Sequence, residues 1–217
     1  MMRTQVGWFT TQAVMFCVVL GVSLAPGGRV LAAAAPQHSR RVVVVDPGHG
    51  GKDPGTTGVT GDQEKTITLA VGREVAAYLA RHDIETRLTR SADRFVSLEA
   101  RAALANRLHA DLLVSIHANS NPDHSIHGFT VYVAPSASAR TQALARAEMK
   151  ALIAAGFPSR GIHRRPYRVL VDSQGPATLI ELGFMSNPAE NARLCNAAVQ
   201  KRYARAIGKG IVAGLKR

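Results

Sequence analysis

Three apolar runs in this chain end abruptly at a histidine or a glutamate: VVVVDPGHGG (42–51), DLLVSIHANS (111–120) and ATLIELGFMSN (177–187). None of them alternates between apolar and polar residues, which is typical of central strands that are covered on both faces. Parallel strands finish on one edge of an open sheet, and ligands bind in the crevice outside that edge. We therefore expect His49, His117 and Glu181 to share one edge of a parallel sheet.

Segments with helical periodicity separate these strands. The helix expected at 64–82 has an apolar stripe at three- and four-residue steps, and Glu64 begins this stripe: Ile67, Val71, Val75, Tyr78. Further helices are expected at 98–108, with Leu98 on the inner side, at 139–155, and from about 189 to 215. Further strands are expected at 84–89, 128–133 and 168–171. This order predicts an α/β fold of three layers, in which helices cover both faces of a mainly parallel sheet.

The composition indicates one folded domain with a basic surface. The 217 residues are 46% hydrophobic, which suffices for a single core, and no shift in composition divides the chain after residue 40. The formal net charge of +12 favours polyanionic surroundings: nucleic acid, anionic lipid or an acidic cell-wall polymer. Only 5% of the residues are aromatic and no stacking pattern is present, which argues against nucleic-acid binding.

The first 35 residues have the pattern of an export signal. Arg3 gives a short basic start, residues 13–25 are uncharged and mostly apolar, and LAAAA (31–35) offers small residues for cleavage. The apolar run is short for a membrane span, so a cleaved signal is favoured over an uncleaved anchor. Phe16 stands where a lipoprotein signal has a small residue, which argues against lipidation of the cysteine that follows it.

We therefore expect a cleavable signal at 1–35, a short linker at 36–40 and one functional domain at 41–217. Such a domain would be exported to the periplasm or to the cell wall outside, with no stable membrane anchor once the signal is removed. Cys195 would be the single cysteine of the mature chain, which excludes an internal disulfide.

The four polar residues at the expected edge each have a competing structural explanation. His49 fits a loop histidine in a glycine turn, and Glu64 fits an acid that complements the dipole of its helix. His117 fits a core histidine with satisfied hydrogen bonds. Glu181 is the strongest functional candidate, because it ends an apolar strand and has no local cationic partner. Together they supply two imidazoles and two carboxylates, which is the ligand chemistry of a catalytic zinc site.

Nearby polar residues are weaker candidates. Ser115 and Asn119 are expected to supply hydrogen bonds that fix the tautomer of His117. Asn119 and His127 are candidate substrate-binding residues, and His127 stands just before the strand expected at 128–133. The remaining histidines are expected in the linker, at helix ends or in polar loops: His38, His82, His109, His124, His163.

Five motifs also occur in one consistent order: DPGHGGKDPG (46–55) with Glu64, LTRSADRFVSLEARAALAN (88–106), SIHANS (115–120), GFTVYV (128–133) and ELGFMSNP (181–188). In this order they resemble the zinc-dependent N-acetylmuramoyl-L-alanine amidases of the type 3 amidase family. The resemblance extends from about Arg41 to the C-terminus. No single motif is decisive, but five in register leave little room for an accidental match.

The resemblance implies that His49, Glu64 and His117 bind one zinc ion and that Glu181 is the catalytic glutamate. It implies a six-stranded, phosphorylase/hydrolase-like sheet flanked by helices. It also implies hydrolysis of the amide between the lactyl group of N-acetylmuramic acid and L-alanine in peptidoglycan. Zinc with three protein ligands keeps a position for water, whose pKa it lowers towards roughly 7. Glu181 would take the proton of this water and later deliver it to the leaving nitrogen.

The partners expected from this resemblance are peptidoglycan and, through the basic surface, anionic polymers of the envelope; no nucleic acid is expected, and the chain is expected to be a monomer. Some relatives carry a long insertion with an inhibitory helix before the catalytic glutamate. Residues 121–178 are expected to be filled by ordinary strands and helices, which predicts an open, constitutively accessible cleft.

Two rival functions share part of this pattern. A zinc carboxypeptidase-like peptidase would use similar ligands, but those enzymes space His and Glu three positions apart, and His49 and Glu64 are fifteen apart. A catalytically inactive wall-binding module would have lost a ligand or the glutamate, and all four residues are present here.

Overall fold

The computed structural model describes residues 40–216. The expected signal (1–35) and nearly all of the expected linker (36–40) therefore lie outside the described residues. Within the described range, no helix is both long enough and apolar enough to cross a membrane.

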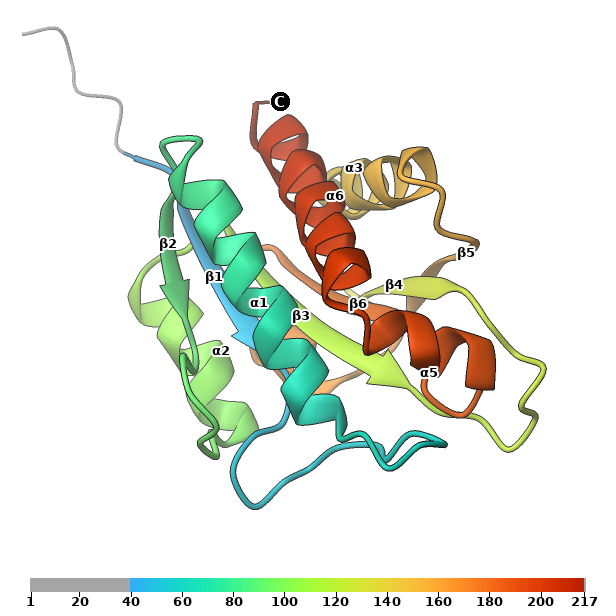
Figure 1. Cartoon of the computed structure of the whole chain (residues 1–217). Coiled ribbons are helices and arrows are strands. Elements are labelled where there is room, and N and C mark those ends of the chain that lie inside the picture. The colour runs from blue at the N-terminus through green and yellow to red at the C-terminus, as the bar shows by residue number, and fades with distance from the viewer. Residues whose placement is uncertain (1–39, 217) are drawn as a thin grey trace, which may run out of the picture. The chain divides into compact units, whose positions relative to one another are not determined.

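A six-stranded sheet forms the centre of the described domain, with the strand order β2-β1-β3-β6-β4-β5 (Figure 1). The strands are β1 (Val42–Pro47), β2 (Glu85–Leu88), β3 (Leu112–Asn119), β4 (Phe129–Val133), β5 (Ser159–Arg164) and β6 (Ala177–Phe184). Neighbouring strands pair in parallel, except that β4 and β6 are antiparallel. The expected mainly parallel sheet of six strands is confirmed.

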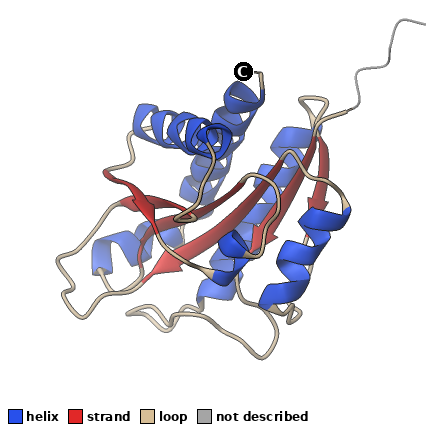
Figure 2. Cartoon of the chain, turned by 180° about the vertical axis from the view of Figure 1, so that it is seen from behind, coloured by secondary structure: helices blue, strands red, loops and turns tan. Residues whose placement is uncertain are grey.

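Helices cover both faces of this sheet (Figures 1 and 2). The larger hydrophobic cluster joins one face to α1 (Glu64–Ala80), α3 (Ala139–Ala154) and α6 (Ala197–Leu215). The smaller cluster joins the other face to α2 (Leu98–Arg107) and α4 (Arg168–Val171). A short helix, α5 (Pro188–Leu194), follows β6. The expected three-layer α/β architecture is therefore confirmed.

The three central strands lie where their continuous apolar runs predicted. Residues 43–45 of β1 and residues 112–114 of β3 are almost fully buried, which requires cover on both faces of the sheet. Because β1, β3 and β6 are parallel, their carboxyl ends meet on one edge, where Ile116 pairs with Pro47 and His117 pairs with Glu181. This edge carries the site described below.

Two short elements differ from the sequence prediction. Residues 168–171, expected as a strand, form the single helical turn α4, in which the amide of Val171 donates to the carbonyl of Tyr167. Four residues are too few to distinguish a period of 2 from a period of 3.6. The edge strand β5 was not predicted, because its exposed sequence SRGIHR has a single large apolar residue.

Two helices also depart in detail. Leu98, expected on the inner side of α2, is 49% exposed, whereas Ala102 and Ala105 are buried as expected, together with Arg101. The helical segment expected from 189 to 215 is two helices, and Asn196 caps the second one by accepting from the amide of Ala198.

Candidate metal centre

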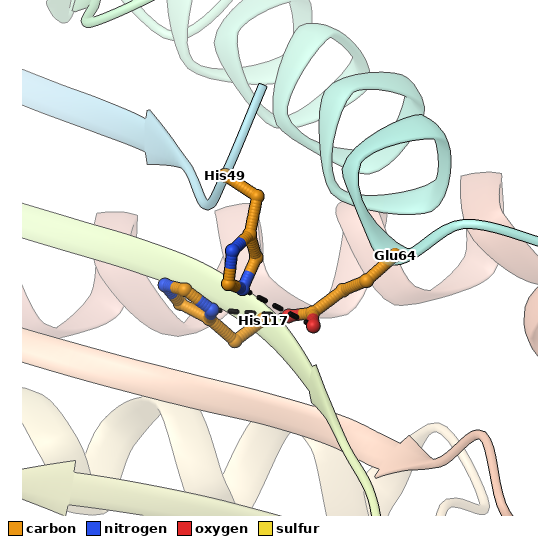
Figure 3. A group of neighbouring side chains, drawn as sticks. All are labelled: His49, Glu64 and His117. Carbon is orange, nitrogen blue, oxygen red and sulfur yellow. Dashed lines mark hydrogen bonds and ion pairs between the residues drawn. The ribbon is translucent and has the colours of Figure 1, made fainter. Parts of the chain in front are cut away.

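Three side chains from three separate elements converge at the carboxyl edge of the sheet (Figure 3). His49 follows β1, Glu64 is the first residue of α1, and His117 lies near the end of β3. Nε2 of His49 is 3.1 Å from Oε2 of Glu64, and Nδ1 of His117 is 3.0 Å from Oε1 of the same carboxylate. One ligand atom from each residue lies within 4.8 Å of the others. The structure thus brings together the three residues that the sequence suggested as ligands.

Glu181 lies beside this group. It is the direct partner of His117 between β3 and β6, and of Thr130 between β6 and β4. Its Oε2 is buried and has no hydrogen-bond partner within residues 40–216. Burial raises the pKa of Glu181 to about 7, against the opposing effect of His117. A carboxyl group with such a pKa exchanges protons readily near neutral pH.

Glu64 is held as an anion despite its burial. Its side chain is 3% exposed, and burial alone would raise its pKa. The hydrogen bonds and charges of His117 and His49 outweigh this effect and lower the pKa of Glu64 well below its usual range. The backbone amides of Thr56 and Ala118 also donate to its two oxygens, each at 2.9 Å. The carboxylate of Glu64 is therefore held in one position and in its ionised form.

The pKa values of the two imidazoles shift in the opposite direction. Burial would lower the pKa of each ring, but hydrogen bonding to Glu64 raises the pKa of His49 to about 8 and also raises that of His117. Nδ1 of His49 is 2.9 Å from Oδ2 of Asp53, so a second carboxylate fixes the orientation of this ring. The carboxylates therefore favour a positive charge at these rings, either a proton or a metal cation that takes the place of the proton.

Two glycines make room for these side chains. A Cβ atom on Gly48 would lie 2.3 Å from Cε1 of His117, so the imidazole of His117 packs directly on this backbone. A Cβ atom on Gly55 would lie 2.6 Å from Oε2 of Glu64 and 2.7 Å from Cδ2 of His49. The glycine-rich loop after β1 is therefore shaped around the three donors.

Arg101 holds His49 in a strained backbone conformation. His49 has φ of 60°, in the left-handed region that costs a residue with a side chain roughly 1–2 kcal/mol. The guanidinium of Arg101 donates to the carbonyls of His49 and Pro47, each at 2.8 Å, and to Oδ1 of Asp46 at 2.7 Å. Arg101 is 3% exposed, so these bonds are shielded from water.

Arg90 joins the loop of His49 to the helix of Glu64. It is fully buried, and its Nη2 donates to the carbonyl of Gly48 and to the carbonyl of Lys65, each at 2.8 Å. Its Nε donates to the carbonyl of Pro47 at 3.0 Å. One guanidinium therefore fixes the separation between two of the three donors.

The donor set fits a catalytic divalent metal. Two imidazole nitrogens and one carboxylate oxygen are a common ligand set for zinc, and three protein ligands leave a position for a reacting molecule. The oriented His49 ring, the anionic Glu64 and the orphaned oxygen of Glu181 all agree with this chemistry.

Comparison with known proteins gives the family. The profile of the N-acetylmuramoyl-L-alanine amidase family matches residues 43–213, which is nearly the whole described domain. The chain belongs to this amidase family. It is accordingly a hydrolase that acts on amide bonds, as the motifs predicted.

Individual relatives of the amidase agree with this assignment. AmiA of Escherichia coli, an N-acetylmuramoyl-L-alanine amidase, is 30% identical over 218 residues, with 80% of this chain and 75% of AmiA covered. A probable cell wall amidase, LytH of Staphylococcus epidermidis, is 32% identical over 180 residues, with 81% and 57% covered. The solved structure of the amidase AmiC2 of Nostoc punctiforme matches with a TM-score of 0.78 and 38% identity, covering 82% of this chain and 98% of AmiC2.

Within the described part of the amidase, the weaker candidates Asn119 and His127 form no hydrogen bond to the three metal-donor residues. The side chain of Asn119 accepts from the amide of Ser120, and His127 is exposed with its Nδ1 3.0 Å from the carbonyl of Ser125. Their substrate-binding roles stay predictions. Ser115, expected to hydrogen-bond to His117, instead donates to Oδ2 of Asp46 at 2.6 Å, so that expectation was wrong.

Sequence reasoning missed the residues that support the amidase site. Asp53 offered a signal, because it follows a candidate ligand by four residues in the same glycine-rich loop. Arg101 offered one as well, since it lies one turn before the buried Ala105. Arg90 lies in the motif LTRSADRFVSLEARAALAN (88–106), but nothing in its spacing indicated that its side chain would be buried.

Proposed function

We propose that this amidase uses one zinc ion to hydrolyse the amide bond between the lactyl group of N-acetylmuramic acid and L-alanine in peptidoglycan. The observation that supports this most directly is the convergence of His49, Glu64 and His117 beside the orphaned carboxyl oxygen of Glu181. The family membership supports the choice of bond, because AmiA and AmiC2 are both N-acetylmuramoyl-L-alanine amidases.

His49, Glu64 and His117 would hold the ion, as the ligand set and its charges favour. When bound, zinc supplies Lewis acidity that lowers the pKa of water and polarises a carbonyl group. The protein's own contribution is a rigid frame: Arg90 and Arg101 hold the loop of His49, and backbone amides hold Glu64.

Glu181 would move the proton. Its carboxylate takes a proton from the attacking water as the water oxygen forms a bond to the amide carbon. The same carboxyl then gives this proton to the nitrogen of L-alanine as the carbon–nitrogen bond breaks. One water is consumed, a lactyl carboxylic acid and a free peptide amine are formed, and Glu181 returns to its starting state; the new acid then releases its own proton to the amine or to solvent.

Replacing Glu181 tests this role. Glu181→Gln keeps the shape of the side chain but cannot accept the proton, so kcat should fall by about 10²–10⁴-fold while zinc content stays at one per chain. Glu148→Gln, a substitution of the same kind at a buried glutamate on α3, provides the control and should retain turnover. Near-normal turnover by Glu181→Gln would refute the assignment.

Metal removal and product analysis test the rest of the proposal. Chelation should abolish turnover, and stoichiometric zinc should restore it. Turnover that persists in the presence of a chelator would exclude the metal mechanism. Digestion of purified peptidoglycan should leave intact glycan strands and release peptides that begin with L-alanine, as mass analysis will show. Shortened peptides would instead indicate the carboxypeptidase-like rival.

We further propose that the amidase works as a monomer in the periplasm or the outer cell wall, attracted to anionic polymers by its net charge of +12. The likeness to a probable cell wall amidase supports this location. The site is expected to be accessible without an activator, so purified enzyme should digest peptidoglycan alone. Activity that appears only after a second protein is added would contradict this.

A further inference from the structure

The basic charge of the amidase is unevenly distributed over its helices. α3 and α6 together carry seven lysines and arginines and a single acid, Glu148, which is 0% exposed. In contrast, α1 balances two basic residues with two acids. The solvent-facing sides of α3 and α6 therefore present cations without any carboxylate of their own.

Four of the exposed cations on this pair of helices have no ion-pair partner among the described residues. Arg146 and Lys150 on α3, and Arg205 and Lys209 on α6, are exposed. Among residues 40–216, no carboxylate lies within ion-pair distance of these four. Their charge is thus available to an external anion.

These cations border a groove between the two helices, which lie side by side in Figures 1 and 2. Gly210 permits close approach, because a Cβ atom there would lie 2.6 Å from Cα of Glu148. A hollow of about 460 Å³ runs beside this contact and has a floor of small residues: Ala143, Ala147, Ala151, Ala154, Gly210, Ala213. Arg146, Lys150 and Lys209 line its sides. We call this hollow the α3–α6 groove.

The α3–α6 groove continues past its first hollow. A second hollow of about 150 Å³ shares Ala151, Ala154 and Lys209 with the first and adds Arg202 and Arg205. The two hollows together form one elongated depression, with cations of both helices along the first hollow and cations of α6 along the second.

We propose that the α3–α6 groove docks a linear phosphodiester polymer of the cell envelope. Arg146 and Lys150 are four residues apart on one side, and Arg205 and Lys209 are four apart on the other. A helix rises 1.5 Å per residue, so successive cations on each side stand about 6 Å apart along the helix axis. A flexible chain with regularly repeated negative charges complements two such rows, and an alanine floor lets a thin chain lie deep between them.

Other occupants fit the groove less well. A membrane-binding face would present bulky apolar or aromatic side chains for insertion, and the floor here is alanine and glycine. Single-stranded nucleic acid stacks its bases on aromatic side chains, and none of the groove-lining residues is aromatic. An acidic protein segment would pair with the cations, but the alanine floor offers no pockets for the apolar side chains by which such segments bind.

The choice of the envelope as the source of the polymer rests on the proposed wall function. Docking through the α3–α6 groove would hold the amidase on the anionic polymer while the catalytic edge of the sheet works on peptidoglycan. Because binding and hydrolysis are measured separately, failure of one is distinguishable from failure of the other.

A charge-matched pair of variants tests the proposal. Lys150→Glu with Lys209→Glu reverses one cation on each side of the groove. Arg81→Glu with Arg107→Glu reverses two exposed cations elsewhere and changes the net charge equally. Binding of each full-length protein to poly(glycerol phosphate) is measured between 50 and 200 mM salt, together with hydrolysis of a small soluble muropeptide.

The groove variant should lose at least about tenfold in affinity. The slope of log affinity against log salt should fall in magnitude by about 1.4, since each lost phosphate contact removes about 0.7. The control variant should lose less than about threefold, and both should hydrolyse the soluble muropeptide at the wild-type rate.

Equal losses in the two variants would overturn the proposal in favour of bulk charge, and so would a wild-type protein that does not bind the polymer. Tighter binding to anionic phosphatidylglycerol vesicles or to polyglutamate, lost in the groove variant alone, would replace the polymer by a membrane or an acidic protein.

Discussion

Replacing Glu148 with glutamine should reduce the fall in the amidase's free energy of unfolding as the pH rises. Glu148 lies on α3, is 0% exposed, and accepts one hydrogen bond, from the hydroxyl of Thr178 at 3.2 Å. Its Oε2 has no partner within the described chain, and burial raises the pKa of Glu148 to about 8. The folded protein therefore keeps this carboxyl group protonated at neutral pH.

The sign of the pH effect follows from the direction of this shift. Below the ordinary pKa of 4.5, the group is protonated in both the folded and the unfolded state and contributes nothing. Between 4.5 and about 8 only the unfolded state ionises, so the free energy of unfolding falls by about 1.4 kcal/mol for each pH unit. Between pH 5 and 8 this amounts to about 4 kcal/mol, a large part of the 5–15 kcal/mol typical of a domain.

Urea unfolding of wild type and Glu148→Gln at several pH values measures this effect. The amide of glutamine has two buried N–H donors without partners, one more than the protonated carboxyl group, and the extra unpaired donor costs about 1–3 kcal/mol at every pH. We therefore expect the variant to be less stable than wild type at pH 5 and more stable at pH 8. Because all other titrating groups are shared, the difference between the two proteins isolates Glu148. A difference that stays constant from pH 5 to 8 would refute the reasoning.

Three further predictions concern the frame of the metal centre. Gly55→Ala should abolish high-affinity zinc binding measured by calorimetry, whereas Gly61→Ala should not; both glycines have positive φ, but only a Cβ on Gly55 meets the candidate ligands. Asp53→Asn should weaken zinc binding by about 10–100-fold, because the imidazole it orients loses an anionic partner; unchanged affinity would remove Asp53 from the site. Arg101→Met should destabilise the fold by about 3–5 kcal/mol in urea unfolding, against about 0.5 kcal/mol or less for the exposed Arg107→Met, since a buried carboxylate loses its partner.

The sequence predicted the features that depend on local patterns. The continuous apolar runs identified β1, β3 and β6, and their shared direction placed His49, His117 and Glu181 on one edge. The helical period identified α1, and the position of Glu64 on its apolar stripe predicted a buried carboxylate. These signals lie within a few residues of one another, so a single sequence contains them.

The features that escaped prediction depend on contacts between distant segments. α4 is one turn long, and its Val169 and Leu170 are buried by packing rather than by a recognisable period. β5 is an exposed edge strand whose pairing with β4 follows from the chain returning alongside it. The burial of Arg101 on α2 depends on its partner Asp46, which lies 55 positions earlier.

The same distinction explains why the sequence identified the candidate ligands but not the residues that hold them in place. A ligand must reach the edge of the sheet, so it stands at the end of an apolar run. A support must reach the backbone of the ligand's loop, which turns its carbonyls inward after β1. Arg90 and Arg101 meet those carbonyls from 42 to 54 positions away, and nothing in the loop's own sequence specifies which side chains will do so. Inward-facing carbonyls must find buried donors, because leaving them unpaired costs about 1–3 kcal/mol each. A glycine-rich loop that ends a buried strand therefore requires cationic or amide donors from elsewhere in the chain, and their burial is as necessary to the site as the ligands are.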